Sequence, residues 1–131
     1  GGQDSRWVAP GSRGRTKAVL LTLNRAGQDG AAYQLTGSAL NAVAAADSGL
    51  QAVLQSGTIS DPVTSVEDGQ EYVTYDIESA QHYVIKAAID NTGRLFAFIV
   101  TAPERNFQQD KKMFSKMVAS FKTYRSASQF V

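Results

Sequence analysis

Three short runs of β-branched and aromatic residues constrain the fold of this chain most strongly. They occupy residues 72–77, 83–89 and 95–100, and each has the length and composition of a β-strand. Only short polar segments separate them, at residues 79–81 and 90–93, and the second contains a glycine that suits a tight turn. Because strands joined by such short connections run antiparallel, the sequence predicts an antiparallel meander in the C-terminal half.

An amphipathic segment follows this meander and predicts a helix. Its apolar residues recur at helical spacing and are Met113, Phe114, Met117, Val118 and Phe121. Lysines occupy most of the remaining positions, so we expect the apolar stripe to face the sheet. Asn106 is the expected N-cap of this helix.

The first part of the chain contains one clear strand and two less regular segments. Residues 18–23 are apolar and read as a buried strand, and residues 24–30 read as a turn. Residues 1–17 are rich in glycine, serine and arginine, and we expect an irregular edge there. Trp7 is the one large apolar side chain in that edge, and it is expected to complete the core.

The segment between these two halves is alanine-rich. Ser38 can cap a short helix over residues 39–47, and Gly49 offers a left-handed stop. Residues 50–59 read either as a strand or as a continuation of that helix, because periodicity does not separate the two over so few residues.

Length and composition narrow the class of protein. A chain of 131 residues suits a single domain, here residues 1–131. The absence of cysteine excludes disulfides, thiolate metal ligands and thiol nucleophiles. Thirteen basic and twelve acidic residues nearly cancel, which argues against nucleic-acid binding. No apolar run approaches the ~20 residues of a membrane span, and residues 1–15 resemble neither a signal nor a transit peptide, as expected for a mature or trimmed form.

Candidate catalytic groups are few. His82 is the sole histidine, so a hydrolytic triad has one candidate base, and a zinc site would lack the further nitrogen or sulfur ligands that it usually needs. Residues 11–17 resemble a phosphate-binding loop but lack its Gly-Lys-Ser/Thr ending, so we interpret them as a solvated basic turn. Carboxylates occur at strand ends and turns, with no spacing that selects an acid–base pair.

Several side chains are instead candidates for binding a partner protein, Trp7 among them as the alternative to its place in the core. They are Arg6, Trp7, Arg13, Arg15, Lys111 and Lys112. Basic residues can contact acidic protein surfaces or simply maintain solubility, and no RNA-binding signature of aromatic and basic residues accompanies them.

Five segments in the C-terminal half resemble motifs of the PsbP family of extrinsic thylakoid-lumen proteins. They occur in the family's order and are DGQEYVTY at 68–75, QHYVIKA at 81–87, GRLF at 93–96, APERNF at 102–107 and MVASF at 117–121. Ser5-Arg6-Trp7 is similar to the family's Pro-x-Gly-Trp segment but lacks the proline. The resemblance implies an α/β/α sandwich with a central antiparallel sheet, of the PsbP/Mog1 type.

The resemblance also implies a function. It implies a non-catalytic subunit or assembly factor, attached peripherally to a photosynthetic complex in the chloroplast thylakoid lumen, with photosystem II and its oxygen-evolving site as the first choice. Other family members serve photosystem I or the chloroplast NADH dehydrogenase-like complex. An alternative of another class is an enzyme or small-ligand binder that uses the concave face of the sheet.

Two residues of this chain fill positions that lie on neighbouring segments in the PsbP pattern, His82 and Glu104. The resemblance implies either a structural pair or, less readily, a weak metal site, for instance for calcium. In a pair, the carboxylate would favour the protonated imidazole, so that the contact would strengthen as the lumen acidifies.

Overall fold

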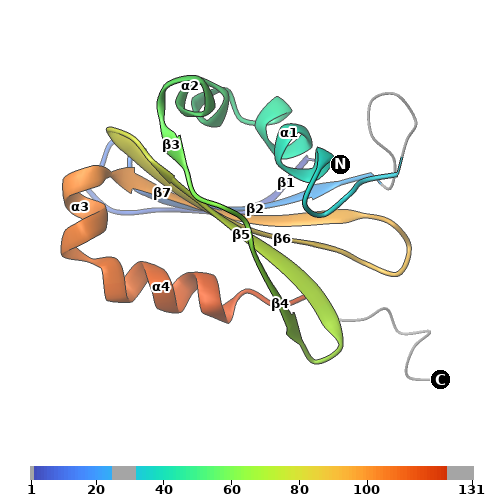
Figure 1. Cartoon of the computed structure of the whole chain (residues 1–131). Coiled ribbons are helices and arrows are strands. Elements are labelled where there is room, and N and C mark those ends of the chain that lie inside the picture. The colour runs from blue at the N-terminus through green and yellow to red at the C-terminus, as the bar shows by residue number, and fades with distance from the viewer. Residues whose placement is uncertain (1, 25–31, 124–131) are drawn as a thin grey trace.

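The computed structural model describes residues 2–24 and 32–123, and within these ranges it contains one seven-stranded sheet with helices on both faces (Figure 1). The strands are β1 (Gly2–Val8), β2 (Lys17–Leu23), β3 (Thr58–Ile59), β4 (Val63–Glu67), β5 (Gln70–Glu78), β6 (Gln81–Ile89) and β7 (Leu95–Pro103). The helices are α1 (Ser38–Ala45), α2 (Ser48–Ser56), α3 (Glu104–Gln109) and α4 (Lys111–Ser120). The predicted α/β/α sandwich is confirmed.

Every strand pairing in this sheet is antiparallel. The order is β1-β2-β7-β6-β5-β3. β4 also pairs with β5, along residues 70–74, whereas β3 pairs with residues 77 and 78 of the same strand. The predicted meander corresponds to β5, β6 and β7. A tight turn at Asp68 and Gly69 joins β4 to β5, and both residues have positive φ, 52° and 79°. Asp-Gly is the preferred sequence for such a two-residue hairpin turn.

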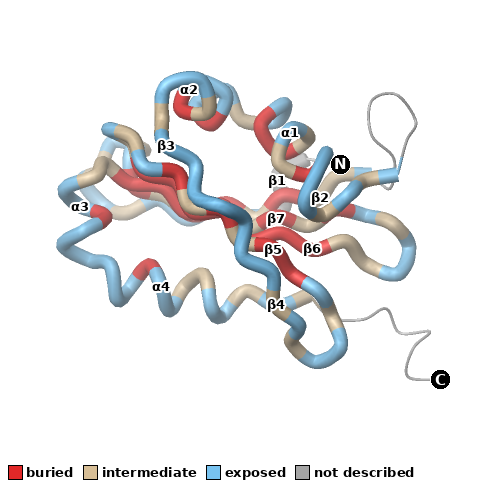
Figure 2. The backbone as a smooth tube through the Cα atoms, viewed as in Figure 1, coloured by how far each residue is buried: buried red, intermediate tan, exposed pale blue. Residues whose placement is uncertain are grey.

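Alternation along the strands creates two separate apolar layers. On one face, odd-numbered residues of β5 and β6 such as Val73, Ile77 and Ile85 pack against α1 and α2. On the other face, even-numbered residues such as Val84 and Val100 pack against α3 and α4. Figure 2 shows these buried residues concentrated along the middle of the sheet.

Residues 50–59 form mainly a helix, which decides between the two readings left open by the sequence. α2 begins after Asp47, whose carboxylate accepts the Leu50 N–H at 3.0 Å, and β3 adds only two residues. The predicted stop at Gly49 is therefore wrong, because Gly49 lies inside α2. A Cβ there would stand 2.5 Å from the Tyr83 hydroxyl, so the close approach explains the glycine. Ser38 does not cap α1 either, since its hydroxyl accepts the Gln34 N–H.

The C-terminal helix is divided in two. α3 starts directly after Pro103, and the break comes at Asp110, so the predicted N-cap Asn106 lies inside α3. Of the predicted apolar stripe, Phe114 is buried, whereas Met113 is 43% exposed. Phe121 lies beyond the end of α4.

The N-terminal edge is more regular than expected. Residues 2–8 form β1, which pairs with β2, so the prediction of an irregular segment is wrong for that part. Trp7 is 41% exposed, so its predicted place in the core is also wrong. Residues 25–30 of the predicted turn lie outside the described residues. Within the described ranges, no helix combines the length and apolar character needed to cross a bilayer.

Candidate functional site

The imidazole of His82 is buried between two carboxylates. Its Nδ1 lies 2.5 Å from Oε2 of Glu104, and its Nε2 lies 2.7 Å from Oδ1 of Asp76. A neutral imidazole has one N–H, so only the protonated ring can donate to both. The side chain is 2% exposed, and its ring stacks on Phe107 with centroids 3.8 Å apart. The arrangement joins β5, β6 and α3 at one end of the sheet.

This arrangement leaves His82 little capacity to bind a metal ion. Both ring nitrogens already contact carboxylate oxygens, and in the described parts of the chain no group of three His, Cys, Asp or Glu side chains could hold a metal. The geometry favours the structural pair of His82 and Glu104 over the metal site.

The carboxyl of Glu104 is stabilised in its ionised form. Burial raises its pKa, but hydrogen bonds from Gln108 and His82 outweigh burial and hold the pKa below its ordinary 4.5. Such a group stabilises the fold fully above the unfolded pKa, and this contribution disappears as the pH falls through the lower folded pKa. The pair therefore keeps its carboxylate charged in mildly acidic solution.

We expect Glu104→Gln to lower the free energy of unfolding by about 1 kcal/mol at pH 7, because the amide offers no charge to the buried imidazole. At pH 3 the difference from the wild type should shrink, since protonation then removes the same charge from Glu104. Urea unfolding at both pH values measures this. Glu78→Gln, at the exposed end of β5, is the matched control, and an equal loss at both pH values would contradict the ionic role of Glu104.

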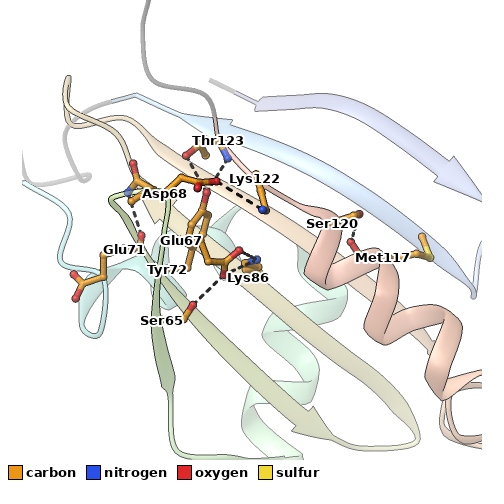
Figure 3. A network of polar contacts seen from close by, with 11 residues as sticks. Ser65, Glu67, Asp68, Glu71, Tyr72, Lys86, Met117, Ser120, Lys122 and Thr123 are labelled. Carbon is orange, nitrogen blue, oxygen red and sulfur yellow. Dashed lines mark hydrogen bonds and ion pairs between the residues drawn. The ribbon is translucent and has the colours of Figure 1, made fainter. Parts of the chain in front are cut away.

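A second buried charge lies further along the same face of the sheet. Nζ of Lys86 is 3.1 Å from Oε2 of Glu67 on β4 and 4.6 Å from the centre of the Tyr72 ring (Figure 3). Ser65 donates its hydroxyl to the same Glu67 carboxylate. The hydrogen bond from Lys86 is the main reason why the pKa of Glu67 is lowered. Lys86 thus fastens the edge strand β4 to the middle of the sheet.

Residues 121–123, which follow α4, contact the hairpin formed by β4 and β5. The Thr123 N–H donates to the Tyr72 hydroxyl at 3.0 Å, and Lys122 lies 3.7 Å from the Asp68 carboxylate. The Phe121 ring packs edge-on against Tyr72. Figure 3 shows the contacts of Lys122 and Thr123 with Asp68 and Tyr72, close to the hairpin between β4 and β5.

Two small cavities adjoin these layers. One, of about 270 Å³, lies between α4 and strands β4 to β6, with Lys86 on its floor and Phe114 and Val118 on its apolar wall. The other, of about 210 Å³, lies between β2 and the start of α2 and is lined by the polar residues Arg6, Lys17, Asp47 and Ser48 together with apolar residues. Neither reaches the ~300–1,000 Å³ of ordinary small-molecule sites.

The six predicted partner-binding residues are all placed at one end of the sheet. The loop between β1 and β2 and the corner between α3 and α4 both lie there (Figure 1). Their proximity follows from two contacts: the Gln81 amide donates to the Arg15 carbonyl, and Gln81 pairs with Pro103, the residue before α3. This basic end is defined by Arg6, Arg13, Arg15, Lys17, Arg105, Lys111 and Lys112.

Among the side chains that the structure describes, those of residues 5–24 and 32–123, the cations of the basic end form no ion pair. The ion pairs in these ranges involve His82, Lys86, Arg94 and Lys122, and none of these belongs to the basic end. A shallow depression over the α3–α4 corner is lined entirely by exposed side chains, which are Gln108, Gln109, Asp110, Lys111, Lys112, Met113, Ser115 and Lys116. The surface is thus positively charged and open to a partner.

Sequence reasoning missed Lys86 and Glu67 as a pair. The available signal was the alternation of side chains along β6. Lys86 lies on the same face of the strand as Val84 and Ala88, so its ammonium group is covered by α4. The partner could not be found in the same way, since β4 has no strand-like alternation in its sequence.

Comparisons with known proteins agree with this fold. The PsbP family model matches residues 27–123, which is well over half of the chain. No curated protein matches this chain. The solution structure of cyanobacterial PsbP (CyanoP) from Synechocystis sp. PCC 6803 is similar, with a TM-score of 0.54 and 19% sequence identity over 84% of this chain and 68% of that one. Identity this low shows a shared fold alone, but the family match shows more: the chain belongs to the PsbP family, which is associated with photosynthetic complexes.

Proposed function

We propose that this domain is a non-catalytic extrinsic subunit or assembly factor that docks on the lumenal face of a photosynthetic complex, with photosystem II and its oxygen-evolving site as the first choice. The observation that carries the proposal is the basic end, whose cations have no internal ion pairs in the described residues. In a protein whose charges nearly balance, seven such cations gathered at one end favour contact with an acidic surface.

Photosystem I and the chloroplast NADH dehydrogenase-like complex are the alternative targets. They share the lumenal setting and would present the same kind of contact to a peripheral protein. The small-ligand or enzyme alternative has less support. The two cavities adjoining the layers are small, and the buried charged groups Lys86 and His82 are already paired. The depression over the α3–α4 corner is larger, about 790 Å³, but it is open and lined by exposed side chains.

Salt should control the docking. We expect washing thylakoid membranes with about 1 M NaCl to release the protein, since the screening length then falls to about 3 Å. The double variant Arg13→Gln, Arg15→Gln should be released at lower salt than the wild type, because two charges of the basic end are lost.

The matched control is Arg94→Gln with Lys122→Gln. It removes the same charge from side chains that are paired with Asp90 and Asp68, away from the basic end. Wild-type protein that resists the salt wash and leaves only with detergent would contradict electrostatic docking.

A further inference from the structure

We propose that the outer edge of β1 binds an extended acidic segment of the partner protein, which adds to the sheet as an eighth strand. The inference rests on the proposed docking function and deepens it by naming the mode of contact and the chemistry of the partner. It is carried by the backbone of β1, by the side chains beside that edge and by the loop that follows.

The backbone of β1 offers unused hydrogen-bonding groups. In the described sheet, β1 is a terminal strand and pairs only with β2. The Ala9 N–H donates to the Thr16 carbonyl at 2.9 Å, so Ala9 points its backbone toward β2. Since an antiparallel strand alternates, the N–H and C=O groups of Arg6 and Val8 point away from β2. A register shift between Gln3 and Ser5 separates the pairing of Gly2 and Gln3 from the longer regular stretch of residues 5–8, to which this alternation applies.

The side chains beside this edge suit an added strand. Trp7 is 41% exposed and Val8 is 39% exposed, and consecutive strand residues lie on opposite faces of the sheet. An added strand would therefore meet an apolar neighbour on each face. In this mode of recognition, backbone hydrogen bonds supply affinity and alternate side-chain contacts supply specificity.

The loop after β1 supplies positive charge in a fixed position. Arg13 has φ of 57°, a left-handed conformation that is unfavourable for an arginine and would suit glycine. The hydroxyl of Ser12 closes the loop by donating to the Ala9 carbonyl at 2.7 Å. The Arg6 guanidinium lies against the loop, 3.9 Å from the position that a Cβ on Gly14 would take. A segment running along β1 would thus pass Arg6 and end beside Arg13.

The opposite edge of the sheet differs in charge. There Val63 and Val66 of β4 are more exposed than Trp7, so that edge also presents apolar side chains. However, β4 is only five residues long. The hairpin that follows it carries Glu67 and Asp68, which already form ion pairs with Lys86 and Lys122 of the same chain. Among the described side chains, arginines without an ion pair lie beside the β1 edge and not beside the β4 edge. This difference favours β1 as the binding edge and an acidic segment as its partner.

The test uses a capped peptide of alternating glutamate and valine, ten residues long, added to the intact chain. Trp7 is the only tryptophan, so its fluorescence reports binding at this edge directly. We expect a blue shift on binding and slower amide exchange at Arg6 and Val8. Val8→Pro should weaken binding about tenfold, because it removes one outward N–H that the β1–β2 ladder does not use.

Two control variants separate the backbone from the side chains. Val8→Ala keeps the N–H and should weaken binding about threefold at most, whereas Arg13→Gln with Arg15→Gln should weaken it about tenfold. Urea unfolding of Val8→Pro establishes that the domain remains folded.

Three results would overturn strand addition. They are wild-type affinity in the folded Val8→Pro variant, equal binding of a peptide with lysine in place of glutamate, and exchange protection at Val63 and Val66 in place of Arg6 and Val8. Salt-sensitive thylakoid binding that persists in Val8→Pro would contradict strand addition while leaving the docking function intact.

Discussion

Replacing Phe114 with alanine is expected to destabilise the domain by about 4 kcal/mol, the largest loss that we predict for one side chain. Phe114 is 1% exposed and is the residue through which α4 enters the apolar layer. Its ring stacks on Phe107 with centroids 5.2 Å apart, and Phe107 in turn stacks on His82. The substitution would leave a cavity next to the Phe107 ring, so lost burial and an unfilled volume both contribute.

Met113 provides the matched control for this experiment. It is the neighbouring apolar residue of the same helix but is 43% exposed, so Met113→Ala should cost less than about 1 kcal/mol. Urea unfolding at pH 7 measures both variants. Equal stability of the two would show that α4 presents a different face to the sheet.

Removing the carboxylate of Glu67 is expected to cost about 3 kcal/mol, because the ammonium of Lys86 would remain buried without a counter-charge. Lys86 is 3% exposed and has the Tyr72 ring as its other close contact. Glu67 keeps some contact with water, which places the expected loss at the lower end of the range for buried ion pairs. Glu67→Ala should also loosen β4, since it breaks that side-chain contact between β4 and β6.

A double-mutant cycle separates the pair from its surroundings. Lys86→Met fills the same space without a charge, so Glu67→Ala should be much less costly in the Lys86→Met background than in the wild type. Urea unfolding of the two single variants and the double variant gives the coupling free energy. Additive losses would contradict a stabilising ion pair between these side chains.

The sequence was most informative where strand-forming residues filled a whole element. β5, β6 and β7 are rich in β-branched and aromatic residues and are joined by short polar segments, so the meander could be predicted. Residues 50–59 were ambiguous because ten residues satisfy both a helical and a strand pattern. Tertiary contacts favour the helix in this segment, because Leu50 and Val53 then lie on one side of α2 and both enter the core.

Other elements depend on contacts that local sequence does not encode. β1 is formed by glycine, serine and arginine as well as by apolar residues, and its pairing with β2 makes it a strand. Trp7 resembles a core residue by type, yet the terminal position of β1 leaves it exposed. For the candidate surface, the residue types were identifiable, but their gathering at one end required the β1–β2 loop to meet α3 through Gln81.

Native gel electrophoresis of solubilised thylakoids tests most directly whether the domain docks on a photosynthetic complex through its basic end. We predict that the wild-type protein co-migrates with such a complex, photosystem II first, and that this association is weakened in the Arg13→Gln, Arg15→Gln variant but retained in Arg94→Gln with Lys122→Gln. A wild-type protein that migrates alone at low salt, while remaining folded, would contradict docking through the basic end.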